Sequence, residues 1–198
     1  MGERLRKIQN FDSFDLKEIN EEMLLSINSR LKEVGYGEKE IFNLLDISDF
    51  HELSFPYLPI YIYRYLQGET PLNTAVKLFM LGYDVTLIEL EELFSENQIN
   101  FLLNLGILHN VFGKYISTVN IFPCLGMLFF TDHLFNKKPE YGNVYYLGQD
   151  SYTLARGMLK EPVESTLDLC TGSGVQGILA SRFSKKVTGV DINPRAVN

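Results

Sequence analysis

A glycine-rich turn near the last residues of the sequence carries the side chains best suited to ligand chemistry. The turn, Cys170-Thr171-Gly172-Ser173-Gly174, follows an apolar, strand-like run over 165–169 and precedes a helix-like segment over 175–183. Gly172 and Gly174 can adopt backbone angles that a side chain would forbid, and they allow a ligand to lie directly on the main chain. The pattern predicts a ligand site where a strand passes into a helix.

A second predicted strand, over 186–190, ends in the acidic residue Asp191. Its distance from the turn is close to the roughly 20 residues at which an acid binds the hydroxyls of a ribose. Gly177, on the first turn of the helix, allows that helix to pack closely on the preceding strand. The sequence therefore predicts a βαβ unit that binds a cofactor containing adenosine. A crossover without a ligand, or a nicotinamide or flavin site, is the alternative, although Cys170 displaces the first glycine of the usual dinucleotide triplet.

Two segments carry a family resemblance. Leu167–Gly174 resembles the first motif of class I S-adenosylmethionine-dependent methyltransferases, and Val190–Ala196 resembles the motif after their second strand. The sequence Leu-Asp-Leu-Cys-Thr-Gly-Ser-Gly is most similar to the motif of the branch that methylates glutamine side-chain amides in release factors and ribosomal proteins. Related branches modify amino groups of nucleic-acid bases. The resemblance covers roughly residues 141–198.

The resemblance implies S-adenosylmethionine as the cofactor and assigns it a set of binding residues. The turn residues and Asp168 would line the amino-acid end of the cofactor, Asp191 would accept hydrogen bonds from both ribose hydroxyls, and Asn193 would lie near the adenine. The segment 146–155 resembles the start of a helix that lies beside the cofactor in such enzymes. The complete predicted set is Gln149, Thr153, Asp168, Cys170, Thr171, Gly172, Ser173, Gly174, Asp191, Ile192 and Asn193.

The catalytic residues implied by the resemblance have no counterpart in this sequence. In the family they belong to an Asn-Pro-Pro-aromatic motif after the fourth strand, whereas Asn193-Pro194 here follows the second strand. We therefore expect the chain to be the N-terminal part of a methyltransferase, with a truncated Rossmann-like fold and catalytic residues beyond Asn198. We expect it to be inactive alone.

The preceding part of the chain is predicted to be mainly helical. Asp15 and Glu18 have the spacing of a capping box, and the helix that they begin should end at Gly35. Thr70-Pro71, Thr86 with Glu89, and Ser95 mark further helix starts. These signals predict helices over 38–45, 59–67, 71–81, 87–94 and 96–105, followed by strands over 107–111, 115–121 and 125–131.

Helices followed by a small hairpin are typical of a winged-helix-like module. A polar segment with Pro and Gly, 136–143, predicts a domain boundary. The expected organisation is a winged-helix-like domain over 1–138, for substrate recognition or packing, and a partial cofactor domain over 139–198. The predicted fold class is α+β overall, with a mainly helical N-terminal domain before the βαβ unit.

Charge disfavours nucleic acid as the direct partner of this part of the chain. The net charge is −7, and acidic residues far outnumber Arg64 and Lys77 within 51–110. The candidate recognition helix over 96–104 contains no Lys or Arg, the residues that contact phosphates and base edges. The resemblance implies that the methyl acceptor is an amide or amino nitrogen of a protein or a nucleic acid, and the sequence does not identify which. A non-enzymatic binding or adaptor role for the winged-helix-like domain is the alternative function.

Metal, disulfide and membrane chemistry are not predicted. His51, His109 and His133 are scattered and form no ligand-like cluster. The two cysteines, Cys124 and Cys170, are expected to be free thiols in a reducing cytoplasm. No apolar stretch approaches the roughly 18 residues of a membrane span.

Overall fold

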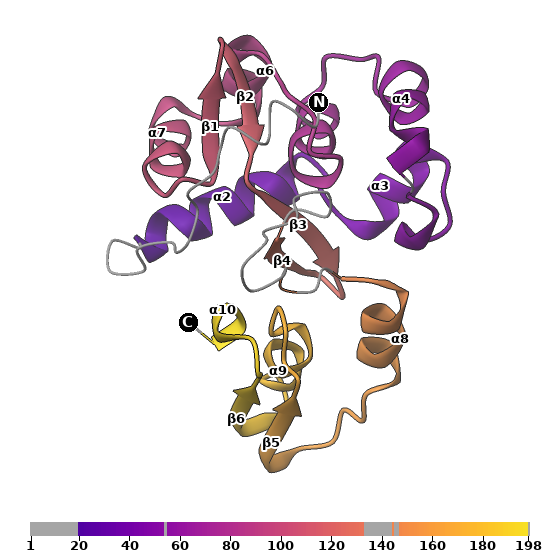
Figure 1. Ribbon diagram of the computed structural model, residues 1–198, viewed down its shortest axis with the longest axis vertical. Coiled ribbons are helices and arrows are strands. Elements are labelled where there is room, and N and C mark those ends of the chain that lie inside the picture. The colour runs from indigo at the N-terminus through magenta and orange to yellow at the C-terminus, as the bar shows by residue number, and fades with distance from the viewer. Residues whose placement is uncertain (1–19, 54, 133–143, 145–146, 198) are drawn as a thin grey trace. The chain divides into compact units, whose positions relative to one another are not determined.

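The computed structural model is a mixed helix-and-sheet protein that divides into two compact units, Met1–Leu128 and Phe129–Asn198 (Figure 1). This agrees with the predicted α+β class. The structure describes residues 20–53, 55–132, 144 and 147–197. The predicted cap at Asp15, the loop 136–143 and His133 lie outside the described residues. The predicted domain boundary stays a prediction.

The first described helix starts later than predicted: Asn20 is its extended N-cap, so the prediction of one helix that begins at Asp15 and continues through this position is wrong. Helix α2, Glu21–Glu33, begins at Asn20, whose side chain accepts a hydrogen bond from the Met23 amide (3.1 Å). Gly35, with φ of 82°, lies just beyond its end, as predicted. Helix α3, Glu38–Leu45, has the predicted bounds.

The predicted helices over 59–67 and 71–81 are only partly α-helical. The first is α4, Leu58–Ile60, continued by the π-helical segment η4, Tyr61–Tyr65. The second is α5, Pro71–Ala75, continued by the π-helical segment η5, Val76–Met80. Short 3-10 turns, η2 (Phe50–Glu52) and η3 (Phe55–Tyr57), precede them.

A π-type turn ends η5, and a side chain from a distant strand contacts the last carbonyls of this segment. The Leu81 amide donates to the Val76 carbonyl, five residues back (3.0 Å). The buried Asn120 side chain donates to the carbonyls of Phe79 (2.8 Å) and Met80 (3.0 Å). These two hydrogen bonds satisfy carbonyls at the C-terminal end of the helix, which have no partner within it. The prediction of a regular α-helix up to residue 81 is wrong, because η5 is π-helical.

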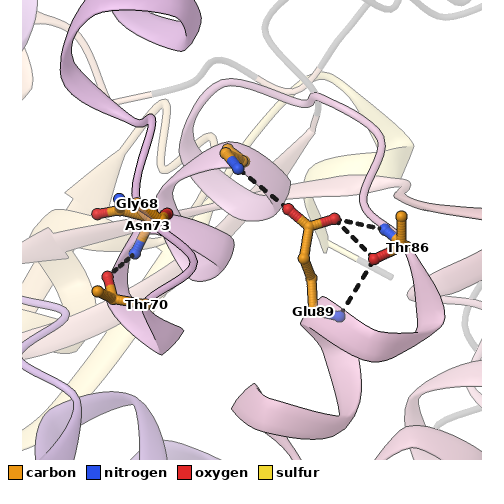
Figure 2. A network of polar contacts seen from close by, with 6 residues as sticks. Gly68, Thr70, Asn73, Thr86 and Glu89 are labelled. Atoms are coloured by element: carbon orange, nitrogen blue, oxygen red, sulfur yellow. Dashed lines mark hydrogen bonds and ion pairs between the residues drawn. The ribbon is translucent and has the colours of Figure 1, made fainter.

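Two capping boxes begin the next helices, as predicted. Helix α6, Leu87–Leu93, starts at Thr86, and helix α7, Glu96–Asn104, starts at Ser95. Figure 2 shows the first box: the Thr86 amide donates to the Glu89 carboxylate (2.7 Å), and the Glu89 amide donates to the Thr86 hydroxyl (3.2 Å). The Lys77 ammonium donates to the same carboxylate (3.0 Å). Glu89 therefore joins the start of α6 to η5.

Glu89→Ala is expected to lower the free energy of unfolding by about 2 kcal/mol, because the cap and a mostly buried ion pair are lost together. Glu89→Gln should cost less, since an amide can still close the capping box. Urea unfolding measures both, with the exposed Glu91→Ala on the same helix as the matched control. A cost at Glu91 equal to that at Glu89 would contradict this assignment.

The same network gives the stability a pH dependence. Burial alone raises the pKa of Glu89, but hydrogen bonds from the Thr86 amide, the Lys77 ammonium and the Thr86 hydroxyl outweigh it and leave the pKa below its ordinary value. A lowered pKa stabilises the fold above the unfolded-state pKa and loses that stabilisation as the pH falls through the folded-state pKa. The difference between wild type and Glu89→Ala should shrink over that acidic range.

Four strands complete the helical part of the chain, and the single predicted strand over 115–121 is wrong. Strands β1 (Leu108–Val111) and β2 (Lys114–Ser117) form an antiparallel pair, with α7 beside β1 and α6 beside β2 (Figure 1). Strands β3 (Val119–Cys124) and β4 (Met127–Asp132) form another two-stranded sheet. The chain leaves the first sheet at Thr118, whose amide donates to the Ile107 carbonyl (2.9 Å).

The core of the first unit is apolar and comes from almost every element. Val76, Leu78 and Phe79 of η5 are fully buried. The helices contribute the following buried side chains: Ile27, Leu31, Ile41, Leu45, Leu90, Leu93 and Leu102. Among the described residues, no helix combines the length and the apolar character that crossing a bilayer requires.

The second unit contains the predicted βαβ arrangement. After α8 (Gln149–Gly157) come β5 (Val163–Leu169), α9 (Val175–Ala180), β6 (Ser184–Val190) and α10 (Pro194–Val197). Strands β5 and β6 are parallel, in a register that pairs Asp168 with Gly189, and α9 packs against both. Helix α9 ends at Ala180 rather than at residue 183 as predicted, because the chain turns there into β6.

Candidate functional site

The predicted turn residues and Asp191 come together at the carboxyl ends of β5 and β6. This is the edge of a parallel sheet at which ligands bind. The Thr171 amide donates to the Val190 carbonyl (3.0 Å), so the turn after β5 is tied to the last residue of β6. The Gly174 amide donates to the Thr171 carbonyl (2.8 Å) and closes the turn on itself.

Asp168 supports the turn from within. Its Oδ2 accepts hydrogen bonds from the Thr171 hydroxyl (2.7 Å) and from the Gly177 amide (2.9 Å). This carboxylate oxygen therefore faces the turn and the first residues of α9. A Cβ atom at Gly177 would lie 3.1 Å from the same oxygen, which is why a side chain is poorly accommodated there.

Gly189 is a site residue that sequence reasoning missed. A Cβ atom at this position would lie 2.9 Å from the Thr171 hydroxyl oxygen and 3.1 Å from the Thr171 Cβ. Thr171 cannot easily move away, because its amide and its hydroxyl are both hydrogen-bonded. A glycine inside a strand often marks such a close approach, and that signal could have identified it.

Asp191 is placed to accept hydrogen bonds from a ligand. Its Oδ2 accepts from the Gly172 amide (2.8 Å) and its Oδ1 accepts from the Asn193 amide (2.8 Å). The Ile192 amide also contributes a backbone hydrogen bond, and because an ionised carboxylate has about four acceptor positions, acceptor capacity remains for a ligand. The hydrogen bonds from the Asn193 and Gly172 amides hold the pKa of Asp191 below its ordinary value. The side chain is therefore anionic at neutral pH and can accept hydrogen bonds from two adjacent hydroxyls.

The backbone of the turn is left-handed at three positions. Gly172 and Gly174 have φ of 53° and 74°, as their residue type predicts, but Cys170 has φ of 60°. A residue with a Cβ is strained in this region. Cys170 is exposed, so little packing offsets the strain. A glycine would adopt this backbone angle without strain.

Cys170→Gly is expected to be more stable than Cys170→Ala by about 1 kcal/mol, because glycine relieves the left-handed strain at some entropic cost. Thermal unfolding of the two variants measures the difference. The backbone of Ser173 is not left-handed, so glycine relieves no strain there. Ser173→Ala should therefore be more stable than Ser173→Gly. Equal stability of the two Cys170 variants would show that the backbone there is not strained.

The remaining predicted residues are more dispersed. Ile192 is fully exposed, and the Asn193 Oδ1 accepts from the Arg195 amide (3.0 Å) at the start of α10. Gln149 and Thr153 lie on α8 and are exposed; the Thr153 hydroxyl donates to the Gln149 carbonyl (2.8 Å). Their place in a cofactor site stays a prediction.

Helix α8 is joined to the site by another side chain of α9. Gln176 Nε2 donates to the Ser151 carbonyl (2.9 Å). Its Oε1 is buried and is the one side-chain oxygen or nitrogen in the described parts of the chain that is both fully buried and without a hydrogen-bond partner. Gln176 therefore fixes α8 beside α9 through a single amide donor.

No group of three or more His, Cys, Asp or Glu within the described ranges could hold a metal ion. No model of a known protein family matches the chain, and no curated protein matches it. The chemistry of the site has therefore to be inferred from its own geometry and from its sequence motifs.

Proposed function

We propose that this chain binds S-adenosylmethionine at the turn between β5 and α9, as the N-terminal portion of a class I methyltransferase. The observation that carries the proposal is the Asp191 carboxylate beside the Gly172 amide, at the carboxyl ends of two parallel strands. When bound, the cofactor supplies a methyl group that its sulfonium already activates. The protein contributes binding and orientation.

The residues present fit such a cofactor. The Asp191 carboxylate has acceptor capacity left beyond its bonds to the Gly172 and Asn193 amides, and the hydroxyls of a ribose would use it. Gly172 and Gly174 leave the main chain of the turn open to close approach. The Ser173 hydroxyl has no hydrogen-bond partner among the residues that the structure describes, so it can donate to the carboxylate of the cofactor. Asn193, two residues after Asp191, donates its amide to the Asp191 carboxylate, and by the resemblance it would lie near the adenine.

The finer architecture forms part of the same proposal. The β5–α9–β6 segment would be the first unit of a Rossmann-like sheet, and the helices with the β1–β2 hairpin would form a winged-helix-like module that recognises the methyl acceptor. Helix α7 carries no Lys or Arg, which favours an acceptor nitrogen on a protein over one on a nucleic acid. The two cysteines are unbonded, which is consistent with a cytoplasmic enzyme.

The direct test is calorimetric titration of the 198-residue chain with S-adenosylmethionine, with NAD as the comparison. We expect saturable binding of S-adenosylmethionine at micromolar concentrations and much weaker binding of NAD. Binding of NAD alone would replace the methyltransferase proposal by a dinucleotide site. Binding of neither, by a folded protein, would refute a cofactor site at this turn.

One observation favours the alternative role as a binding or adaptor protein. Phe112, at the tip of the β1–β2 hairpin, is 88% exposed, and Ile88 on α6 is 72% exposed. Large exposed apolar side chains often contact a protein partner. The substrate-recognition role proposed above would use the same exposed side chains. The titration distinguishes the two roles, because only the methyltransferase role requires binding of S-adenosylmethionine.

A further inference from the structure

A bidentate ion pair fixes the segment that follows β6. Arg195 on α10 donates through Nη1 and Nη2 to Oδ2 (2.6 Å) and Oδ1 (2.8 Å) of Asp132, the last residue of β4. The Val144 amide donates to the same Oδ2 (2.9 Å). Both charged side chains are largely shielded from water, with 18% and 22% of their surfaces exposed. A shielded bidentate pair of this kind is stronger and more directional than an ordinary surface ion pair.

Hydrogen bonds connect this ion pair to the carboxylate of the candidate site. The Arg195 amide donates to the Asn193 Oδ1 (3.0 Å), and the Asn193 amide donates to the Asp191 Oδ1 (2.8 Å). The other oxygen of Asp191 accepts from Gly172 in the turn (2.8 Å). A fixed position for Arg195 therefore also restricts Asn193 and Asp191.

Packing within the described part of the chain contributes little to the position of this segment. Helix α10 has only four residues and buries none of them, and helices this short are not stable by themselves. Ile192, between Asp191 and Asn193, is fully exposed. Polar contacts, rather than packing, therefore determine where the segment 191–195 lies.

We infer that Asp132 and Arg195 are positioning residues of the cofactor site: their ion pair holds the segment 191–193 so that the Asp191 carboxylate meets the ribose. The inference rests on the proposed binding of S-adenosylmethionine at this site. Asp132 lies far from the predicted motifs in the sequence, which is why only the structure identifies it.

The test uses the full chain and two readouts. Asp132→Asn should weaken S-adenosylmethionine binding about tenfold, because the ion pair with Arg195 is lost and no longer holds the segment 191–193 in position. In the ligand-free protein, the same substitution should speed hydrogen exchange at the amides of Gly172 and Asn193. The charge-exchanged double variant Asp132→Arg with Arg195→Asp should recover most of both properties, which a merely destabilising change would not do.

Two further variants complete the design. Glu164→Gln breaks the exposed ion pair with Lys185 in the same unit and should change neither readout. Arg195→Lys keeps the charge but loses the bidentate geometry, so it tests the inference if Asp132→Asn does not fold.

The outcomes separate the inference from the proposed function. If wild type binds S-adenosylmethionine and folded Asp132→Asn binds equally well with unchanged exchange, the positioning role is wrong. If wild type does not bind the cofactor, the proposed function fails and the positioning role in a cofactor site fails with it. The exchange rates then still show whether the ion pair orders the segment 191–193.

Discussion

Asp191→Ala is expected to weaken the binding of S-adenosylmethionine at least about a hundredfold, because two hydrogen bonds to a charged acceptor are lost. In the proposed complex, the carboxylate accepts hydrogen bonds from both ribose hydroxyls in addition to those from the Gly172 and Asn193 amides. The substitution removes both and also releases the Gly172 and Asn193 amides. Calorimetric titration at neutral pH measures the effect, with circular dichroism to show that the variant is folded.

Two variants make this result specific. Asp191→Asn keeps one acceptor oxygen and should lose less affinity than Asp191→Ala. Glu161→Ala removes an exposed acidic residue of the same unit and should leave the affinity unchanged. If Asp191→Ala is folded and binds as tightly as wild type, Asp191 is not the ribose acceptor.

The affinity should also depend on pH in a defined direction. The Asn193 and Gly172 amides lower the pKa of Asp191, so the carboxylate stays ionised below the pH at which an ordinary Asp becomes protonated. Binding that uses the ionised form should persist through mildly acidic pH and fall as the pH drops through this lowered pKa. The Asp191→Asn variant should lack that acidic transition.

Asn120→Ala is expected to lower the free energy of unfolding by about 3 kcal/mol, the largest single effect on stability that we predict. The Asn120 side chain is fully buried and donates to the carbonyls of Phe79 and Met80 at the end of η5. Truncation leaves these carbonyls without that donor and opens a cavity. Urea unfolding followed by circular dichroism measures the loss.

A substitution of nearly the same size tests the cause. Asn120→Asp preserves the volume but replaces a donor by a carboxylate that faces two carbonyl oxygens, so it should cost at least as much as alanine. Asn100→Ala, on the exposed side of α7, is the control and should change stability by less than about 0.5 kcal/mol. A tolerated Asn120→Asp would mean that the hydrogen bonds to η5 contribute little.

Sequence reasoning predicted those elements whose signals are local. The capping boxes at Thr86 and Ser95 join residues three apart, so the sequence alone specifies them. Helix α3, between Gly37 and Asp46, also has its predicted bounds, although no side chain caps its start. Features that depend on distant partners were not predicted. The capping of the last η5 carbonyls by Asn120, some 40 residues later, is one of them.

In the candidate site, too, residues with a local sequence signal were predicted, and contacts that depend on the fold were not. Gly172, Gly174 and Asp191 were identified from residue type and spacing, and the structure brings them to one edge of the β5–β6 pair. The contact of Thr171 with Gly189 depends on the parallel register, which spacing alone does not give. The pairing of Asp132 with Arg195 depends on how the second unit folds, and no local sequence pattern predicts it.

The most direct test of a cofactor site at this turn is nuclear magnetic resonance of the 15N-labelled chain during titration with S-adenosylhomocysteine, which has the same adenosine group. The amides of Gly172 and Asn193 donate to Asp191 in the structure, so hydrogen bonds from a ribose to that carboxylate should shift both resonances. We predict saturable shifts at these two amides and none at Leu45, in the first unit. Unchanged Gly172 and Asn193 resonances at millimolar ligand would contradict the account.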